Sequence, residues 1–309
     1  MKKIFIDGSV GTTGLRIVDR LASRDDIELI TIPEDKRKDP DARKEALNSS
    51  DVAFLCLPDA AAIESVELID NPDTVVIDTS TAHRTDEGWC YGFPELSEAI
   101  MDRLPTAKRI AVPGCHASGF ISLVYPLIEA GIISADLKLT CHSITGYSGG
   151  GKKMIAEYED ENKDFLLDAP RQYGLSQQHK HLKEMKRITG LDSEPIFCPI
   201  VSDFYSGMTV TVPLFATDLK KGTVDGIKEL YRNKYCGNIV KYVDAEELGA
   251  FISAHDMAKK DSMRITVCGN GDRILLIAMY DNLGKGASGA AVECLNYVLG
   301  VSPETGLEL

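Results

Sequence analysis

The first 115 residues alternate short β-rich runs with stretches of helical periodicity, and this alternation restricts the possible folds more than any other feature. The β-rich runs predict strands at 3–6, 27–32, 52–57, 74–78 and 109–112. Helical periodicity between them predicts helices at 12–23, 40–48 and 59–69. Strands that are joined by helical crossovers run parallel. We therefore expect an α/β domain at 1–115, built on an open, doubly wound parallel sheet.

A different pattern begins near 115–135, where strands stop alternating regularly with helices. A helix is predicted from about 117 to 130, with Gly131 placed to end it. Later runs predict strands at 137–145, 195–201, 208–215, 239–243, 264–268 and 273–280. Further helices are predicted at 152–161, 179–189, 223–234 and 287–299. We expect residues 116–281 to form a second, α+β domain with a mixed or antiparallel sheet.

The composition argues against several classes of partner. A net charge of −13 disfavours a nucleic-acid or anionic-membrane surface, because clustered lysine and arginine must meet the phosphates. No apolar stretch reaches the roughly 20 residues that span a bilayer, and no signal peptide precedes the first strand. The eight cysteines include no Cys-x-x-Cys pair, which argues against a zinc ribbon. We expect a cytoplasmic protein that binds neither nucleic acid nor membrane.

A glycine-rich turn joins the first strand to the first helix. Glycines at 8, 11 and 14 would let the backbone approach a pyrophosphate, which the helix dipole then stabilises. Val10 stands where the commoner Gly-x-Gly-x-x-Gly pattern has its middle glycine, so a plain strand-turn-helix is the alternative. We predict that a dinucleotide binds the whole turn, Gly8, Ser9, Val10, Gly11, Thr12, Thr13 and Gly14.

The end of the second strand bears on the choice of dinucleotide. An acidic residue there would bind the ribose 2′-hydroxyl of NAD, whereas a basic residue would bind the 2′-phosphate of NADP. The sequence offers both, Glu34-Asp35 and then Lys36-Arg37-Lys38. We favour NADP, with Arg37 as a contact. NAD, or a solvated charged loop without a ligand, remains open.

The most informative segment surrounds Cys115. A predicted strand is followed by Pro113-Gly114, and this sequence places Cys115 at the start of a predicted helix. Free thiols have a pKa of about 8.5, which a helix N-terminus and a nearby imidazolium can lower by one or more units. Small residues at 117–119 would leave room for a substrate and keep backbone N–H groups available to a developing oxyanion. Unlike the other cysteines, Cys115 lies outside the apolar runs. We predict that it is a nucleophile.

The proton-transfer partner is sought among six histidines. His179 and His181 lie at the start of a helical stretch in the second domain, suitably placed to reach across a cleft. A metal-binding pair is the competing interpretation, but no third ligand has suitable spacing, so no metal is predicted. His116 adjoins the cysteine, yet neighbouring residues on a helix point to different sides. We expect His179 or His181 to be the acid/base, with packing or surface roles for His83, His142 and His255.

Two further segments follow strands and are rich in small residues. The segment 147–152 has the form of a mobile anion-binding turn, and a simple flexible loop is an equal alternative. The segment 281–291 implies a helix that packs very closely against another backbone or a ligand.

Together these segments resemble the N-acetyl-γ-glutamyl-phosphate reductases of arginine biosynthesis, in their shorter form. The similar segments follow the family order: Gly8–Gly14, Asp78–Arg84, Tyr91–Glu95, Pro113–Cys115, His179–His181 with Glu184, Gly207-Met208, Val212–Leu214 and Asp281–Ala291. They span nearly the whole chain. Within them, His116 and Ser118 stand where an aromatic residue and threonine are more usual. The related aspartate-semialdehyde dehydrogenases share a two-domain plan, which implies that residues 282–309 complete the first domain with a returning helix.

The resemblance also implies a mechanism. Cys115 would attack an acyl phosphate and release phosphate, and NADPH would then reduce the thioester to a semialdehyde, with His179 or His181 as acid/base. The resemblance places Ser80 and Asn282 beside the nicotinamide. It places the anionic groups of the substrate near Arg84, Ser148, Gly149 and Gly150. A homodimer or homotetramer is implied as well.

Three alternatives stay open at this point. An aspartate-semialdehyde dehydrogenase or another acyl-phosphate reductase would share the plan and act on a different acyl group. A Cys-His hydrolase or acyltransferase would need no cofactor, and the glycine turn argues against it. A nucleotide-sensing protein with an inactive site would lack a reactive thiol at Cys115.

Overall fold

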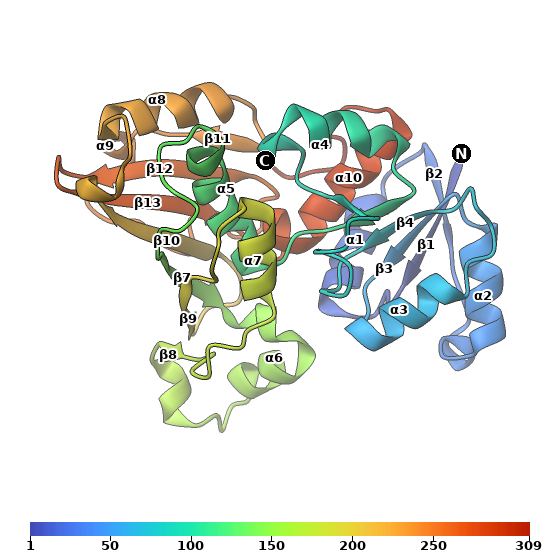
Figure 1. Ribbon diagram of the computed structural model, residues 1–309. Coiled ribbons are helices and arrows are strands. Elements are labelled where there is room, and N and C mark those ends of the chain that lie inside the picture. The colour runs from blue at the N-terminus through green and yellow to red at the C-terminus, as the bar shows by residue number, and fades with distance from the viewer. The chain divides into compact units, whose positions relative to one another are not determined.

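The computed structural model describes all 309 residues and divides the chain into two compact units (Figure 1). The first unit comprises Met1–Pro113 and Ala287–Leu307, and the second comprises Gly114–Gly286 with Glu308–Leu309. The sequence analysis ended the first domain after residue 115, whereas the first unit of the structure ends at Pro113. Cys115 thus belongs to the second unit.

The first unit is built on a six-stranded, wholly parallel sheet with the order β2-β1-β3-β4-β6-β5. Its strands are β1 (Lys2–Asp7), β2 (Ile27–Ile30), β3 (Val52–Leu55), β4 (Val75–Asp78), β5 (Cys90–Tyr91) and β6 (Arg109–Ala111). Its helices are α1 (Thr12–Leu21), α2 (Pro40–Ser49), α3 (Asp59–Glu67), α4 (Glu98–Arg103) and α10 (Gly289–Leu299). The strand order steps outward in both directions from β1, which confirms the doubly wound α/β class.

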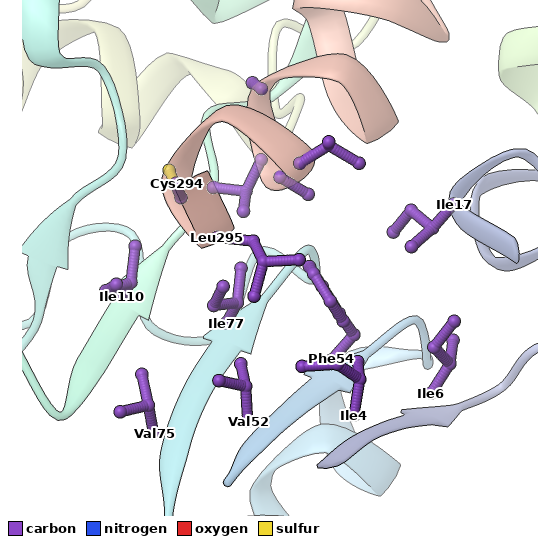
Figure 2. Packing of buried hydrophobic residues seen from close by; sticks show 14 of the residues in the cluster. Ile4, Ile6, Ile17, Val52, Phe54, Val75, Ile77, Ile110, Cys294 and Leu295 are labelled. Carbon is purple, nitrogen blue, oxygen red and sulfur yellow. The ribbon is translucent and has the colours of Figure 1, made fainter. Parts of the chain in front are cut away.

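Helices cover both faces of this sheet, because successive side chains on a strand point to opposite sides. On one face the strands pack under α1 and α10. Figure 2 shows this cluster, in which Leu295 of α10 lies over Phe54 and Ile77. On the other face Phe5 packs with Leu47 of α2 and with α3. Helix α10 therefore returns from the end of the chain to complete the first unit.

The second unit is built on a seven-stranded mixed sheet with the order β11-β12-β13-β10-β7-β9-β8. Its strands are β7 (Thr140–Gly146), β8 (Arg171–Gln172), β9 (Ile196–Ser202), β10 (Met208–Phe215), β11 (Val240–Tyr242), β12 (Met263–Gly269) and β13 (Arg273–Tyr280). Its helices are α5 (Cys115–Glu129), α6 (Gly151–Glu159), α7 (His181–Thr189), α8 (Val224–Lys234) and α9 (Ala245–Leu248). Helix α5 packs against β10 and β13, and α7 packs against α5.

The mixed sheet confirms the predicted architecture of the second half. Gly131 follows α5 with a φ of +65°, as expected of a residue that ends a helix. The sequence analysis missed four short elements, which are β5, β8, α4 and α9. No helix of the structure combines the length and the apolar character needed to cross a membrane.

A buried ion pair ties β1 to the helices on one face of the first sheet. The Asp7 carboxylate accepts hydrogen bonds from the Arg43 guanidinium at 3.0 and 3.2 Å and from the Ser65 hydroxyl at 3.0 Å. Asp7 and Arg43 are 4% and 8% exposed, so neither charge is hydrated if its partner is lost. The two charges therefore depend on one another.

We expect Asp7→Ala to lower the free energy of unfolding of the first unit by about 3 kcal/mol, because the buried Arg43 would keep only a longer ion pair, at 3.8 Å, with the exposed Glu64. Urea unfolding followed by the fluorescence of Trp89, the single tryptophan, measures this unit directly. The matched control is Asp73→Ala, which removes an exposed partner of Lys108 and should cost at most about 1 kcal/mol. Equal losses in both variants would contradict the prediction.

Candidate active site

Cys115 is the first residue of α5, with Gly114 as the N-cap, so the helix begins two residues earlier than expected. The first turn contains no acidic residue. Its N–H groups and the helix dipole therefore place positive potential at the cysteine. The partly exposed thiol lines a pocket of about 330 Å³ within the second unit.

The first turn of α5 is held by side chains from two other elements. The Gly114 N–H donates to the buried Glu184 carboxylate of α7 at 2.8 Å. The Tyr280 hydroxyl, at the end of β13, donates to the Cys115 carbonyl at 2.5 Å and accepts from the Gly119 N–H at 3.0 Å. These bonds fix where the sulfur can lie.

Glycines let neighbouring backbone approach this turn. A Cβ atom on Gly119 would lie 2.6 Å from the Tyr280 hydroxyl, and one on Gly286 would lie 3.1 Å from the Cβ of Cys115. Gly286 lies in a short π-helical turn, Gly284–Ser288, which precedes α10. The close packing expected of the segment 281–291 is thus seen against the cysteine itself.

The structure brings both predicted histidines to the pocket of Cys115. His179 and His181 line it, with their ring centroids 4.7 Å apart. They belong to the same unit as the cysteine and do not face it from another domain. No group of three histidine, cysteine or acidic side chains in the structure is arranged to hold a metal ion.

His116 also lines this pocket, so the expectation that it points elsewhere is wrong. Its ring centroid lies 5.7 Å from that of His179 and 5.5 Å from that of His181. The reason is that side chains in the first turn of a helix all lean toward its N-terminal end, where the pocket lies. The sequence did contain a signal for this placement, because His116 directly follows Cys115, but the sequence analysis gave that signal little weight.

Two hydrogen bonds fix the His116 ring. Its Nδ1 lies 2.7 Å from the Ser143 hydroxyl of β7, and its Nε2 lies 2.6 Å from the Tyr173 hydroxyl. Burial, and to a lesser extent the charge of His179, lowers the pKa of His116 to about 3. Burial, with a contribution from a negative charge on Cys115, raises the pKa of Tyr173. Both groups are therefore neutral near pH 7.

The glycine-rich turn predicted to bind anions contributes to the same pocket. Gly149 and Gly150 line it, just before α6. Ser148 is buried and accepts a hydrogen bond from the Asn282 amide at 3.0 Å. The Asn282 carbonyl oxygen accepts from the Gly207 N–H at 2.9 Å. In this structure Ser148 and Asn282 thus tie three loops of the second unit together.

Ser80 and Arg84 lie in the first unit, beyond the end of β4. Ser80 donates to the buried Asp78 carboxylate at 2.7 Å. The buried Arg84 guanidinium donates to the carbonyl oxygens of Val112 and Thr79, each at 2.8 Å. Their assignment to nicotinamide and substrate stays a prediction.

The turn after β1 has the close backbone packing that its glycines predicted. Gly8 has a φ of +87°, and a Cβ atom there would lie 2.3 Å from the Cys56 carbonyl oxygen. A Cβ atom on Gly14 would lie 2.4 Å from the Gly8 carbonyl oxygen. Gly11 is the N-cap of α1, with an ordinary φ of −72°. A cradle that excludes side chains at Gly8 and Gly14 suits a phosphate group on the helix N-terminus.

A cavity of about 820 Å³ in the first unit adjoins this turn. Ser9 and Val10 line it on one side, and Arg37 and Lys38 line it beyond the end of β2. Arg37 lies 3.5 Å from Glu34 in an exposed ion pair, so its guanidinium remains accessible. The cavity thus offers a phosphate cradle together with a basic group.

Sequence analysis missed several residues of the Cys115 pocket, which are His116, Thr145, Gly146, Met154, Tyr173, Lys180 and Val201. Tyr173 follows the two-residue strand β8, which no periodicity reveals. Its approach to His116 depends on the pairing of β8 with β9. No signal in the sequence would have found it.

Solved structures with the same fold are aspartate semialdehyde dehydrogenases. Enzyme II from Vibrio cholerae, complexed with ASA, has a TM-score of 0.72 at 14% identity, covering 97% of this chain and 98% of that one. The enzyme from Francisella tularensis has 0.73 at 13% identity, covering 97% and 100%. The enzyme from Candida albicans, solved with NADP, has 0.69 at 15% identity, covering 97% and 99%. Identity this low establishes the fold alone.

Two family models match the chain. The NAD binding domain of semialdehyde dehydrogenases matches residues 3–103, and their dimerisation domain matches residues 115–282. The chain belongs to the semialdehyde dehydrogenase family, and it is an oxidoreductase. The cofactor-independent hydrolase considered from the sequence is therefore disfavoured.

Within that family, the relatives with curated names are N-acetyl-gamma-glutamyl-phosphate reductases. Those of Brucella ovis and Brucella canis are each 45% identical to this chain over 306 residues, covering 96% of this chain and 99% of the relative. The resemblance inferred from the motifs is thereby confirmed.

We expect iodoacetamide at pH 7 to alkylate Cys115 rapidly, because the thiol lines an accessible pocket at a helix N-terminus. Burial raises the pKa of Cys56 to about 12 and also raises that of Cys141, so both should stay unmodified up to about pH 9. Peptide mass spectrometry measures each site, and the exposed Cys236 serves as the accessibility control. Alkylation of Cys115 slower than that of Cys236 would contradict this expectation and favour an inactive site.

Proposed function

We propose that this enzyme reduces N-acetyl-γ-glutamyl phosphate to N-acetyl-L-glutamate 5-semialdehyde and phosphate with NADPH, as a step of arginine biosynthesis. The carrying observation is a cysteine at a helix N-terminus that shares its pocket with His179 and His181. The 45% identity to reductases named for this substrate supports the choice of acyl group. Eight free cysteines favour a reducing compartment, the cytoplasm.

The acyl-transfer step begins with the Cys115 thiol. His179 or His181 takes the thiol proton, and the sulfur forms a bond to the acyl carbonyl carbon. The tetrahedral adduct then collapses, the bond from carbon to the phosphate oxygen breaks, and phosphate leaves with the electron pair. A thioester remains on Cys115. The positive end of the α5 dipole favours the thiolate over the thiol before attack.

Reduction completes the reaction at the same sulfur. When bound, the reduced nicotinamide supplies the hydride that takes the thioester to the aldehyde level. The resulting thiohemiacetal collapses as its carbon–sulfur bond breaks, and Cys115 leaves as thiolate. The thiohemiacetal hydroxyl takes its proton from the histidinium formed in the first step and gives it back on collapse. Cys115 and the histidine then share one proton, as they did at the start.

The first unit fits a dinucleotide. The cradle at Gly8 and Gly14 would hold the pyrophosphate, with the rest of the turn, from Ser9 to Thr13, around it. The cavity beside it is large enough for the adenosine half. The accessible guanidinium of Arg37 favours NADP over NAD, because it can pair with a 2′-phosphate. Ser80 and Asn282 are retained as proposed neighbours of the nicotinamide.

The anionic groups of the substrate are assigned to the second unit's glycine turn and to Arg84. Gly149 and Gly150 lie beside Cys115 and before the N-terminus of α6, whose first turn has no acidic residue. Backbone N–H groups in such a turn can bind a carboxylate or phosphate. The hydrogen bond from Asn282 to Ser148 would fix the backbone conformation of this turn.

We expect Cys115→Ser to lower kcat for the phosphate-dependent oxidation of N-acetylglutamate semialdehyde by at least about 1,000-fold, because a serine hydroxyl is a weak nucleophile without a depressed pKa. NADP and NAD are assayed in parallel by absorbance of the reduced dinucleotide. Cys236→Ser, at an exposed cysteine, should keep full activity. A fully active Cys115→Ser variant would remove the covalent mechanism.

Substrate choice is tested with aspartate semialdehyde in the same assay. Preference for the aspartyl substrate would reassign the enzyme to the activity named for its structural relatives. We expect a clear preference for the N-acetylated glutamyl substrate.

We also propose that the enzyme is a homodimer that pairs through the open face of the second sheet. The face opposite α5 exposes Ile144 on β7, Ile196 on β9, Phe215 on β10 and Leu275 on β13. The strand registers place these side chains on one side of the sheet. Several large apolar side chains exposed on one face of a sheet are typical of an interaction surface. The description of the matching family model as a dimerisation domain supports this choice.

We expect Ile144→Lys to shift the protein from dimer to monomer, because a lysine ammonium would be buried against apolar side chains. Light scattering after size exclusion would then give the chain mass of 33.7 kDa in place of twice that value. Ile63→Lys, at an exposed position on α3, is the control and should stay dimeric. A dimeric Ile144→Lys variant would place the interface elsewhere.

A further inference from the structure

Among the polar groups of the Cys115 pocket that the proposed mechanism does not use is the hydroxyl of Tyr173. Tyr173 follows β8, and its ring packs with a small apolar cluster of Tyr158, Leu167 and Val201. The hydroxyl lies 2.6 Å from Nε2 of His116. Which of these two groups donates determines whether the Tyr173 hydrogen is available to a substrate.

The buried Ser143 hydroxyl settles that direction. Ser143 is fully buried, and the only hydrogen-bond partner of its side chain is Nδ1 of His116, at 2.7 Å. A buried hydroxyl that donates no hydrogen bond costs about 1–3 kcal/mol. Ser143 therefore donates to Nδ1, which must then carry no hydrogen.

The hydrogen of the neutral imidazole consequently lies on Nε2. Burial keeps His116 in the neutral form, with a pKa of about 3, so the ring has one hydrogen to place. Nε2 donates it to the Tyr173 oxygen. Tyr173 then accepts from His116, and its own hydrogen is left to point into the pocket that Cys115 lines.

Cys115 lies close enough for this hydrogen to matter. Cys115 and Tyr173 line the same pocket, and the pKa of Tyr173 is raised by burial and, in addition, by a negative charge on Cys115. The raised pKa also keeps the hydroxyl protonated throughout the range in which the enzyme can work. An acyl group on the sulfur would bring its carbonyl oxygen into the same pocket.

We propose that Tyr173 is a catalytic residue whose hydroxyl donates a hydrogen bond to the carbonyl oxygen of the acyl group on Cys115, and that Ser143 and His116 are positioning residues that aim it. This inference rests on the proposed thioester chemistry. The oxygen becomes anionic when the sulfur adds and again when the thioester is reduced. A donor fixed in advance stabilises both tetrahedral states more than the planar acyl group.

The chain of donors runs in one direction, from Ser143 to His116 to Tyr173 to the substrate. Reversal would require Tyr173 to donate to Nε2 and Nδ1 to donate to Ser143, which leaves the Ser143 hydrogen without an acceptor inside the sheet. Without the Ser143 hydroxyl, Nδ1 has no partner in either tautomer, so the preference for hydrogen on Nε2 becomes weaker. Ser143 is not among the residues that line the pocket, so it can affect the chemistry only through His116.

The first experiment determines the tautomer of His116 by ¹⁵N NMR of histidine-labelled protein, with the signals assigned by their loss in His116→Gln. We expect hydrogen on Nε2 in the parent enzyme and a weaker preference for Nε2 in Ser143→Ala, because Nδ1 then lacks a partner in both tautomers. Ser122→Ala removes a different buried hydroxyl, which donates to the Gly119 carbonyl, and should leave the tautomer unchanged. Hydrogen on Nδ1 in the parent enzyme would overturn the proposal.

The second experiment measures kcat and KM for three variants. We expect Tyr173→Phe to lower kcat by about 100-fold, as loss of one oxyanion donor does, with little change in KM. Ser143→Ala should lower kcat by about tenfold, because the hydroxyl of Tyr173 then turns partly to His116. Ser122→Ala should keep the parent kcat. An unchanged kcat in Tyr173→Phe or in Ser143→Ala would overturn the proposal.

The two experiments separate this inference from the assignment of the substrate. The tautomer requires no substrate, and the kinetic pattern applies to any acyl group carried on Cys115. If the enzyme preferred aspartate semialdehyde and the Tyr173→Phe loss persisted with it, the substrate assignment alone would fall. An active enzyme with hydrogen on Nδ1 would leave the substrate assignment standing and remove the relay.

Discussion

The first turn of α5 is the point on which the site depends, because three backbone groups there are held by side chains from other elements. Glu184 accepts from the Gly114 N–H, while Tyr280 bridges the Cys115 carbonyl and the Gly119 N–H. Glu184 lies on α7, the helix that His181 begins. The same hydrogen bond therefore ties the start of α5, which Cys115 begins, to α7, which His181 begins. The proposed nucleophile and one of its two proposed proton acceptors are thus positioned together within the second unit.

Burial keeps one of the three histidines of this pocket, His116, neutral near pH 7. The charge of His179 adds to burial in lowering the pKa of His116, which stays neutral near pH 7. An imidazolium that balances a Cys115 thiolate must therefore be His179 or His181. A neutral His116 is suited to a different task, since only a neutral ring can accept from Ser143 on one side and donate to Tyr173 on the other.

The sequence predicted the features that arise from local periodicity and local backbone geometry. Alternating runs gave the parallel sheet, and Gly8 and Gly14 prove to be positions where a Cβ atom cannot fit. The position of Cys115 at a helix start followed from Pro113-Gly114 in the same way. Tyr173 and Ser143 could not be found, because their meeting at His116 is set by the pairing of β7, β8 and β9. Contacts between strands that lie far apart in the chain produce no periodic pattern in the sequence.

The structure also shows where this fold can vary around Cys115. Structures 13–15% identical share the architecture over nearly the whole chain, so the two sheets tolerate extensive substitution. The Cys115 pocket, by contrast, is lined largely by residues between β7 and α7, a segment that departs from the sheet and has its own small apolar cluster. Met154 and Tyr173 belong both to that cluster and to the pocket wall. Changes in this segment can reshape the pocket while β10 and β13 keep α5, and with it the sulfur, in place.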